Sequence, residues 1–345
     1  MNLILIFASS GTLVGGMEKQ VALQAQYLAR IPATNVTVIA SPAYKTLFDQ
    51  TVIFIPTEMK RSRRNPSLLF ELIKNVHRIK PDIIHAHGHK AASLLGNLRL
   101  FIKREIQLIG TAHGLKRKNK AFKKLDTVFA VSKSIQNALN PINAIVTYNG
   151  IEPYEVPIPP PINKAAFCAS LGLDSKLPLI LGVGRLVKLK NFDRLIKASK
   201  NLEANLVILG DGPEFQQLQA LISNNVALTG FREDTRSIMH LADLMVICSD
   251  REGFSLVLIE ALQSDLPVIS TRVGVALEIL PEEYLIESSD ETVLSTKLHQ
   301  QLADLITLKE KQKELFIQAK HDFNIERVTA YTQELYQKSL TGNNK

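Results

Sequence analysis

The sequence predicts an α/β protein with two doubly wound domains, and three observations lead to that prediction. First, its 345 residues suffice for two domains at the usual ~100–200 residues each. Second, short apolar runs rich in β-branched residues alternate with amphipathic stretches in both halves of the chain. Third, a cluster of prolines interrupts this alternation near the middle. Repeats of strand, helix and strand form parallel sheets with helices on both faces.

The first half begins the alternation. Its predicted strands are Leu3–Ala8, Val36–Ala40, Thr51–Ile55, Asp82–Ala86, Ile106–Thr111, Thr127–Val131 and Ala144–Tyr148. Its predicted helices include Met17–Arg30, Leu68–Ile79 and Lys133–Leu139. The strands are almost continuously apolar, as expected when helices cover both faces of the sheet.

A proline-rich segment marks the predicted domain boundary. The segment GIEPYEVPIPPPI favours a stiff, extended chain, because proline cannot continue a helix or a central strand. Its prolines are Pro153, Pro157, Pro159, Pro160 and Pro161. We therefore expect a first domain over residues 1–155, a linker over 156–162, and a second domain over 163–323.

The second half resumes the alternation after the linker. Its predicted strands are Leu179–Val183, Asn205–Leu209, Val226–Leu228, Leu244–Ile247, Pro267–Ser270 and Tyr284–Ile286. Its predicted helices are Asn191–Lys200, Pro213–Ile222, Asp234–Leu241, Ser255–Leu262 and one long tail from about Asp290 to Ala319. A final helix over 325–340, which Asn324 can cap, is expected to complete the first domain. Two such domains predict a cleft at the carboxyl ends of their strands, where ligands bind.

Composition excludes several classes of protein. Charged residues make up 21% of the chain and no segment is of low complexity, which argues against extensive disorder. The two cysteines, Cys168 and Cys248, cannot form a disulfide framework or a cysteine-rich metal site, so a reduced, cytosolic protein is expected. The apolar amino terminus, MNLILIF, is far shorter than the ~20 residues of a membrane span and lacks the basic start of a signal peptide. We expect it to be a buried strand.

Positive charge is concentrated in residues 60–124. This segment holds 17 Lys and Arg against three acids, a balance of +14, whereas the rest of the chain has 24 basic and 30 acidic residues. The asymmetry indicates an acidic partner, such as membrane lipid, nucleic acid or a phosphorylated glycan, or else a solvated face. The segment offers only three aromatic residues for base stacking, Phe70, Phe101 and Phe122, so nucleic acid is not expected.

An anionic membrane surface is the partner we expect for this segment. Its charges include the run KRSRR from Lys60 and the run KRK from Lys116. Three apolar residues among or beside the charges, Leu115, Phe122 and Leu125, are expected to insert at the interface.

A glycine turn in the second half predicts an anion-binding site. The turn Gly182–Leu186 directly follows a predicted strand, and Lys188, Lys190 and a predicted helix come next. Glycine permits a close approach of the backbone, while Arg185 and Lys190 supply positive charge. The pattern is neither GxGxxG nor a P-loop, so dinucleotide and Walker-type sites are not expected.

Two carboxylates in the segment EGFSLVLIE predict a site for hydroxyl groups. Glu252 follows the strand Leu244–Ile247, and Glu260 lies ~7 Å along the next helix at ~1.5 Å per residue. The helix is otherwise apolar around Glu260, so this carboxylate is expected to be at least half-buried and to need partners. Vicinal hydroxyl groups of a sugar are suitable partners.

Histidines form a second cluster of interest. His85, His87 and His89 alternate along one predicted strand and its exit, and His113 follows the next strand. Zinc is one interpretation, because alternate strand residues share a face. However, the third histidine falls beyond the strand and no carboxylate accompanies the group, so we predict no metal site. The sequence also contains no Asp-x-Asp motif.

Several segments occur in an informative order. GVGRLVKLKNFDRLIKA, VILGDGPE, LTGF, ADLMVICSDREGFSLVLIEAL and PVISTRVG follow one another over about residues 180–280. Together they resemble family 4 retaining glycosyltransferases of the GT-B fold. SSGTLVGGMEKQ, PDIIHAHG, IGTAHGL, FAVSKSIQ and TYNGIE extend the resemblance more loosely through the first half.

The resemblance implies that the first domain, residues 1–155, binds the acceptor and that the second, residues 163–323, binds the nucleotide sugar. It also implies a role for individual residues. The donor diphosphate would be held by Arg185 and Lys190 beside Gly184, and the ribose by Glu260. The donor sugar would face Glu252, Gly253, Phe254 and Ser255, with His113 at the reaction centre. Gly15 and Gly16 would bring backbone N–H groups to the diphosphate and the acceptor. Phe231 and Arg232 would lie near the nucleotide base.

The resemblance also implies a reaction. It is the metal-independent transfer of a sugar, with retention and without a cofactor, from a nucleotide sugar, most often a UDP-sugar. The acceptor would be a glycan or a lipid-linked glycan in bacterial cell-surface polysaccharide or lipopolysaccharide synthesis. The enzyme would be cytoplasmic and peripheral at the inner face of the membrane. The alternatives are another GT-B enzyme, such as a nucleotide-sugar epimerase or a phosphorylase, and a non-catalytic protein that binds sugar nucleotides or nucleic acid.

The chain departs from the pattern of this family at a few positions. Lys188 and Leu189 stand where the family commonly has Pro-Glu, and Asn191 stands where it has glycine. QSDL precedes Pro267 in place of a segment that often contains Ala-Cys-Gly, and Val275 replaces a second glycine. These departures bear on the donor sugar more than on the class of reaction.

Overall fold

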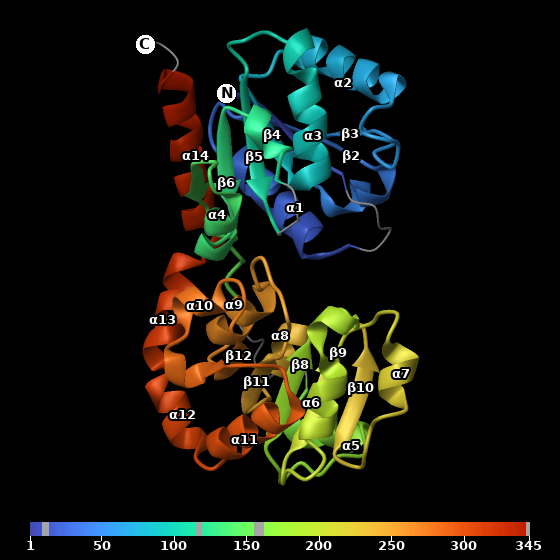
Figure 1. Ribbon diagram of the computed structural model, residues 1–345, viewed down its shortest axis with the longest axis vertical. Helices are drawn as coiled ribbons and strands as arrows, with labels where there is room; N and C mark the ends of the chain where they lie inside the picture. The colour runs from blue at the N-terminus through green and yellow to red at the C-terminus, as the bar shows by residue number, and fades with distance from the viewer. Residues whose placement is uncertain (9–13, 115–118, 155–161, 343–345) are drawn as a thin grey trace. The chain divides into compact units, whose positions relative to one another are not determined.

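The computed structural model contains two compact units (Figure 1). Unit 1 consists of Met1–Ile151 and Phe323–Lys345, and unit 2 consists of Glu152–Asp322. The residues that the structure describes are 1–8, 14–114, 119–154 and 162–342. Four of the predicted linker prolines, from Pro157 to Pro161, therefore lie outside the described residues.

Unit 1 is built on one parallel sheet, whose described strands are ordered β3-β2-β1-β4-β5-β6-β7. The strands are β1 (Asn2–Phe7), β2 (Asn35–Ala40), β3 (Ile53–Pro56), β4 (Ile83–His87), β5 (Gln107–Ala112), β6 (Thr127–Ala130) and β7 (Ala144–Val146). Nearly every side chain of β1, β2, β4 and β5 is buried, which confirms that both faces of the sheet are covered. The edge strand β3 has no buried residue.

Helices and short 3₁₀ segments surround this sheet. The α-helices are α1 (Gly16–Ala29), α2 (Pro66–Ile79), α3 (Gly88–Leu98), α4 (Lys133–Leu139) and α14 (Ile325–Thr341). The 3₁₀ segments are η1 (Pro42–Leu47), η2 (Arg99–Phe101) and η3 (Phe122–Lys124). Side-chain caps explain where several helices begin, because an oxygen of Asn65, Ser132 or Asn324 accepts an N–H of the first turn of α2, α4 or α14. The predicted cap by Asn324 is confirmed.

The carboxyl-terminal helix α14 packs on the sheet of unit 1. Tyr336 of α14 is buried in the same apolar cluster as Leu5 of β1 and Val21 of α1. The phenol oxygen of Tyr336 lies 2.6 Å from Nδ1 of His85 in β4. The amide of Gln24 in α1 donates to Thr332 of α14 at 3.2 Å. These buried contacts join residues about 250 to 310 positions apart in the sequence.

Unit 2 repeats the design with a second parallel sheet, whose described strands are ordered β10-β9-β8-β11-β12-β13. The strands are β8 (Leu179–Val183), β9 (Asn205–Leu209), β10 (Val226–Gly230), β11 (Leu244–Ile247), β12 (Val268–Thr271) and β13 (Leu285–Ile286). The α-helices are α5 (Lys164–Ser170), α6 (Phe192–Ala198), α7 (Phe215–Gln219), α8 (Thr235–Met239), α9 (Leu256–Gln263), α10 (Ala276–Ile279), α11 (Glu291–Leu302), α12 (Leu305–Lys311) and α13 (Lys313–Asp322). Two 3₁₀ segments are η4 (Lys188–Lys190) and η5 (Glu282–Tyr284).

The predicted strands are confirmed to within two residues at each end, whereas one predicted helix was wrong and the helices α3, α5 and α10 were not identified. The sequence analysis did not identify α3, although Ala91, Leu94, Leu95 and Leu98 have helical spacing. The predicted tail helix is three helices, α11 to α13. Asp304 causes the first break, because it leaves the helical conformation and its side chain accepts the N–H of Thr307 to begin α12.

Each sheet contains one point where the strand order reverses direction. In unit 1 this switch point lies between β1 and β4, and in unit 2 it lies between β8 and β11. Ligands of doubly wound proteins bind outside the carboxyl ends of the strands at such points. The fold therefore directs attention to the loops that follow β1 and β4, and those that follow β8 and β11.

Candidate functional site

The two loops at the switch point of unit 2 carry most of the residues that were predicted to bind the donor. The loop after β8 contains Gly184, Arg185 and Lys190, and it leads into α6. The loop after β11 contains Glu252 and leads into α9, which carries Glu260. The structure thus brings together, on adjacent strands, residues that lie more than 60 positions apart in the sequence.

Glycines allow the backbones at this edge of the sheet to approach closely. Gly184 has a φ of +153°, and a Cβ atom there would lie 3.3 Å from Cε of Lys190. Gly210, after β9, has a φ of +147°, and a Cβ atom there would lie 1.9 Å from the carbonyl oxygen of Gly184. Only glycine fits at position 210, because the Cβ atom of any other residue would collide with the turn that carries Arg185.

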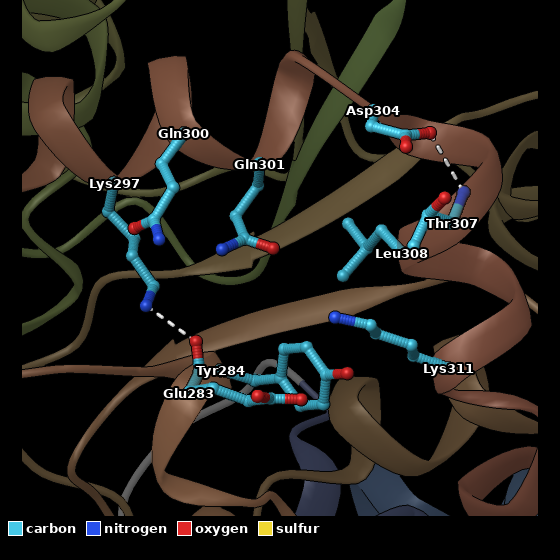
Figure 2. Close-up of a pocket in the computed structure, with 9 residues that line it drawn as sticks. All are labelled: Glu283, Tyr284, Lys297, Gln300, Gln301, Asp304, Thr307, Leu308 and Lys311. Carbon is cyan, nitrogen blue, oxygen red and sulfur yellow. Dashed lines mark hydrogen bonds between the residues drawn. The ribbon is translucent and has the colours of Figure 1, made fainter.

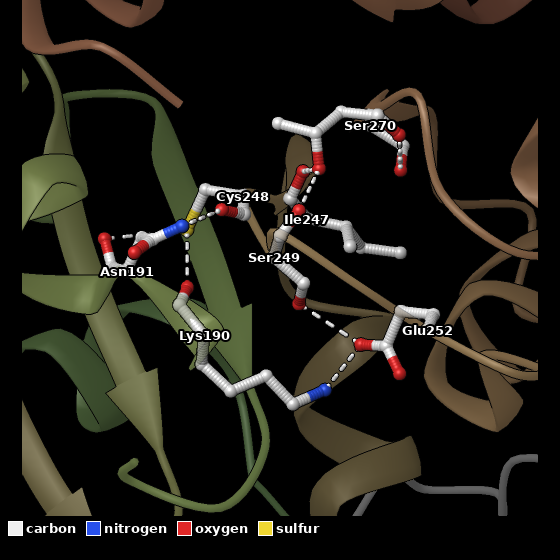
Figure 3. A network of polar contacts seen from close by, with 8 residues as sticks. Lys190, Asn191, Ile247, Cys248, Ser249, Glu252 and Ser270 are labelled. Atoms are coloured by element: carbon white, nitrogen blue, oxygen red, sulfur yellow. Dashed lines mark hydrogen bonds and ion pairs between the residues drawn. The ribbon is translucent and has the colours of Figure 1, made fainter. Parts of the chain in front are cut away.

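Lys190 and Glu252 form an ion pair across the switch point (Figure 3). Nζ of Lys190 lies 2.5 Å from Oε1 of Glu252, and the same oxygen accepts the hydroxyl of Ser249 at 2.9 Å. Both charged side chains are mostly buried, at 19% and 14% exposed. Ser249 is fixed in turn, because its carbonyl oxygen accepts the hydroxyl of Thr271 at 2.6 Å. The sequence analysis did not assign a role to Ser249 or Thr271.

Arg185 differs from Lys190 in its exposure and in its contacts. Its side chain is exposed, and it forms no hydrogen bond or ion pair with any residue that the structure describes. A guanidinium that is paired with a carboxylate already has a counter-charge, whereas this exposed one is available to an anionic ligand. The loop after β8 therefore presents the exposed cations of Arg185 and Lys188 beside Lys190, which is paired with Glu252.

Glu260 lies half-buried in α9, as predicted. Arg236 of α8 lies near it: burial lowers the pKa of this guanidinium, and the negative charge of Glu260 acts in the opposite direction. Nη2 of Arg236 lies 3.3 Å from Oε1 of Gln263, one turn beyond Glu260. The sequence analysis missed Arg236, because nothing in the local pattern shows that α8 packs against α9.

The segment between the two carboxylates packs tightly. Gly253 and Phe254 are half-buried, and Ser255 is buried immediately before α9. The Ser255 hydroxyl has no hydrogen-bond partner among the described residues. Gly274, after β12, packs closely against this segment, since a Cβ atom there would lie 3.0 Å from Cβ of Glu252.

The residues predicted to lie near the nucleotide base follow β10. Phe231 is 67% exposed, which leaves its ring open for stacking. Arg232 is already paired, because its Nε and Nη2 donate to the two carboxylate oxygens of Asp234 at 2.7 and 2.6 Å. The N–H of Gly210 donates to the carbonyl of Gly230 at 2.8 Å, which places this segment beside the turns after β8 and β9.

In unit 1, Gly15 and Gly16 stand at the beginning of α1. Gly16 is the first residue of the helix and Gly15 is its cap. The N–H of Gly15 donates to Oε2 of Glu18 at 3.0 Å, so it is not free in this structure. The residues immediately before them, 9–13, lie outside the described residues.

Neutral histidines occupy the carboxyl ends of β4 and β5. Nδ1 of His87 lies 3.1 Å from Nε2 of His113, and the Nε2 atom of His87 is buried without a hydrogen-bond partner among the described residues. Burial lowers the pKa of His85 to about 3 and that of His113 to about 4, and it lowers the pKa of His87 well below its ordinary value. These imidazoles are therefore uncharged at neutral pH.

The arrangement of these histidines is not that of a metal centre. Both ring nitrogens of His85 have partners, the hydroxyl oxygens of Tyr336 and Thr111 at 2.6 and 2.7 Å. His89 lies in α3 instead of continuing the strand. Across the described part of the chain, no three His, Cys, Asp or Glu side chains are grouped to hold a metal ion.

A hollow of about 370 Å³ in unit 2 lies apart from all of these residues (Figure 2). It is lined by Glu283, Tyr284, Lys297, Gln300, Gln301, Asp304, Thr307, Leu308 and Lys311. Because Glu283 and Tyr284 immediately precede β13, the hollow lies at the amino-terminal edge of the sheet. Lys190 and Glu252 lie at the opposite edge, so we place the candidate site at the switch point and not in this hollow.

The basic segment 60–124 requires one correction. Phe122 was expected to insert into a membrane, but it is completely buried between Gly110 and His89. Leu125 is half-buried against Gly110, and Leu115 and Lys116–Lys118 lie outside the described residues. The apolar side chains that this segment exposes are different ones, namely Leu100 at 88%, Phe101 at 56% and Phe70 at 69%. No helix of the described residues is long and apolar enough to span a membrane.

Comparisons with known proteins identify the family. Residues 163–322 match the family described as glycosyl transferases group 1, and residues 14–155 match glycosyltransferase family 4. An uncharacterised glycosyltransferase of Methanocaldococcus jannaschii is 31% identical over 258 residues, which cover 68% of each chain.

Other relatives match over shorter stretches. N-acetyl-α-D-glucosaminyl L-malate synthase of Bacillus anthracis is 29% identical over 145 residues, 39% of this chain and 38% of the synthase. A lipopolysaccharide core biosynthesis glycosyltransferase of Rhizobium meliloti is 34% identical over 110 residues, 30% of this chain and 32% of that protein.

A solved structure shows the same fold over nearly the whole chain. HepE of Anabaena, in complex with UDP and glucose, superposes with a TM-score of 0.82 at 20% identity and covers 98% of this chain and 100% of its own. The two Rossmann-like sheets are those of the GT-B fold. The chain therefore belongs to the group 1 glycosyltransferases.

Proposed function

We propose that this glycosyltransferase transfers a sugar, with retention and without a metal ion, from a UDP-sugar to a glycan or a lipid-linked glycan. The observation that carries the proposal is the switch point of unit 2, where Arg185 has no partner among the described residues and Lys190 lies against Glu252. UDP is bound in the HepE structure, which has this fold. The name of the Rhizobium meliloti relative supports an acceptor in bacterial cell-surface polysaccharide or lipopolysaccharide synthesis.

The two basic residues would bind the donor diphosphate. Arg185 offers an unpaired guanidinium, and Lys190 exchanges Glu252 for a phosphate oxygen when the donor arrives. Ser249 keeps its hydrogen bond to Glu252, so the carboxylate stays in place and becomes free to accept a hydroxyl of the donor sugar. Glu260 accepts the ribose hydroxyls, with Arg236 behind it.

Retention would follow from chemistry at the leaving phosphate. Retaining glycosidases use two carboxylates ~5–5.5 Å apart, one of them as a nucleophile. The candidate site instead concentrates positive charge, which stabilises a departing diphosphate while that diphosphate takes the proton of the acceptor hydroxyl. His113 has a lowered pKa and is neutral, so in its predicted place beside the donor sugar it acts by hydrogen bonding and not as an acid.

A donor panel tests the proposal. Thermal unfolding of the enzyme is measured with UDP-, GDP- and ADP-sugars, and again for the variant with both Arg185→Ala and Lys190→Ala. A ligand at 100 times its dissociation constant stabilises the folded state by ~2.7 kcal/mol. We expect a UDP-sugar to raise the melting temperature of the wild type and not that of the variant. Stabilisation by none of the three, or equal stabilisation of the variant, would contradict the proposal.

We further propose that unit 1 binds anionic membrane, where a lipid-linked acceptor is found. The exposed Leu100 and Phe101 lie beside the exposed Lys103 and Arg104 in one short stretch of chain. Apolar side chains can enter the interface while each basic residue near it contributes ~1 kcal/mol. This attraction decays over a Debye length of ~8 Å at physiological salt.

Vesicle binding tests this second proposal. We expect the wild type to sediment with phosphatidylglycerol vesicles at low salt and to be released by 0.5 M NaCl. Changing Leu100 and Phe101 to serine should weaken sedimentation. The matched control changes Ile306 and Ile317, which are exposed apolar residues of unit 2, to serine. Equal binding to neutral phosphatidylcholine vesicles, or no binding at any salt, would favour a solvated face and a soluble acceptor.

A further inference from the structure

Two loops of unit 2 run side by side and are joined by hydrogen bonds. Residues 189–191 end the loop after β8, and residues 248–250 begin the loop after β11. The N–H of Asp250 donates to the carbonyl of Leu189 at 2.9 Å, and Sγ of Cys248 lies 3.0 Å from the carbonyl oxygen of Lys190. Lys190 lies within this paired stretch, and its charged partner Glu252 lies two residues beyond it.

Asn191 is the centre of this junction. Its side chain is 5% exposed, and its Nδ2 atom lies 3.0 Å from the carbonyl oxygen of Cys248, 2.6 Å from Oδ1 of Asp250 and 3.0 Å from Oγ of Ser289. Ser289 also donates to Asp250 at 2.9 Å and accepts Nη1 of Arg194 at 2.6 Å. One buried amide therefore ties the loop after β8 to the loop after β11 and to the segment before α11.

The backbone of Asn191 has a demanding conformation. Its φ of +52° and ψ of +33° lie in the left-handed region, which asparagine tolerates better than other residues with a Cβ atom. Glycine would adopt this conformation without strain but would provide no amide. Asparagine meets both requirements, since it turns the chain into α6 and supplies the buried donor.

We propose that Asn191 is a positioning residue for sugar transfer. Its amide holds the loop that carries Lys190 against the loop that carries Glu252, and so sets where the charge for the diphosphate lies relative to the carboxylate for the sugar. This inference rests on the proposed function of that pair. A displacement of ~1 Å between catalytic groups can lower a rate by ~10²-fold, which is why a residue that touches no substrate can control turnover.

The decisive variant is Asn191→Gly, which can keep the left-handed backbone conformation and removes the side chain that carries the amide. We expect kcat to fall by about tenfold or more, with a smaller change in the KM for the donor, because electrostatic attraction of the diphosphate persists while alignment is lost. The matched control is Asn225→Ala. The Asn225 amide also lies near three carbonyl oxygens, those of Ser199, Leu202 and Ala204, but at the amino-terminal edge of the sheet. We expect this control to lower the melting temperature and to leave kcat within about twofold.

A second variant guards against misfolding of the first. Ser289→Ala removes one partner of the amide, and we expect a smaller fall in kcat in the same direction. Lys190→Ala is measured beside both. If Lys190→Ala impairs transfer while Asn191→Gly and Ser289→Ala retain wild-type kcat, the positioning role is wrong and the proposed function stands. If Lys190→Ala has no effect, the proposed function fails and this inference fails with it.

Discussion

The two parallel sheets carry different side chains at the carboxyl ends of their strands. In unit 2, the carboxyl ends of β8 and β11 lead to charged side chains, the pair Lys190–Glu252 and the exposed Arg185. In unit 1, the carboxyl ends of β4 and β5 carry the neutral imidazoles of His87 and His113. Among the described residues, one Rossmann-like architecture therefore presents a charged pair at these strand ends in unit 2 and neutral imidazoles in unit 1.

This difference teaches that the loops, and not the sheets, determine the chemistry that each unit presents to a ligand. Paired and unpaired positive charges suit a diphosphate, which carries charge that must be neutralised as it departs. Neutral histidines suit hydroxyl groups, which need hydrogen bonds but no counter-charge. The comparison predicts that substitutions of charged residues in unit 2 lower the rate of transfer. It also predicts that acid lowers the stability of unit 1, because its buried imidazoles become protonated.

The largest expected effect is the loss of one positive charge at the edge of unit 2. Lys190→Ala and Arg185→Ala should each lower turnover by ~10²–10³-fold without changing the fold. The loss of one preorganised group that stabilises charge in the transition state typically lowers kcat by this factor. Lys200→Ala, two residues beyond the carboxyl end of α6, is the matched control and should retain wild-type turnover. If steady-state kinetics give both site variants a turnover within tenfold of wild type, the proposed role of positive charge at the edge of unit 2 is wrong.

A sharper comparison separates the two carboxylates of unit 2. Glu260→Ala should raise the KM for the donor by ~10–100-fold, because a hydrogen bond to a charged group contributes ~1.5–3 kcal/mol and the ribose is bound equally in the ground and transition states. Glu252→Ala should instead lower kcat. Equal effects of both changes on KM alone would show that their roles are assigned wrongly.

Acid should weaken unit 1 more than unit 2. The pKa values of His85 and His113 are lowered to about 3 and about 4, and that of His87 is lowered well below its ordinary value, so the unfolded chain binds more protons below pH ~6.5. Their contribution to stability is complete above that pH and decreases as the pH falls, by ~1.4 kcal/mol per histidine and pH unit.

Hydrogen exchange of the full chain measures this effect. Amides of β4 and β5 should lose more opening free energy between pH 7.5 and 5.5 than amides of β8 and β11. In unit 2, burial lowers the pKa of His240 as well, so a smaller loss is expected there. Equal losses in the two sheets would contradict the comparison.

The smallest expected effect is that of chelation. Arg185 and Lys190 already supply positive charge for the diphosphate, so EDTA should leave transfer activity unchanged. Complete loss of activity, restored by Mg²⁺ or Mn²⁺, would contradict a metal-independent transfer.

Local patterns in the sequence predicted the strands and the residues that directly follow them. The glycine turn after β8 and the acidic segment after β11 are continuous stretches of sequence, so their positions at the carboxyl ends of strands could be predicted. The contacts of Lys190 with Glu252, of Ser249 with Thr271 and of Asn191 with Ser289 could not. They depend on which strands become neighbours, and that order is set by the packing of the whole unit.

Burial was the other property that the local sequence did not reveal. Phe122 lies among lysines and was expected to be exposed, but its ring is buried and packs against Gly110. His85 is neutral because it is completely buried, and Tyr336, 251 positions later in the chain, lies against its ring. Both outcomes arise from contacts between segments that are distant in the sequence.

The central claim is that Arg185 and Lys190 bind the diphosphate of the donor, and calorimetric titration tests it most directly. UDP and uridine are titrated into the wild type, into the Arg185→Ala, Lys190→Ala double variant and into the Lys200→Ala control. We predict that the wild type and the control bind UDP at least about tenfold more tightly than uridine, a difference of ~1.4 kcal/mol or more, and that the double variant loses this preference. A double variant that still prefers UDP by the wild-type factor would contradict the account.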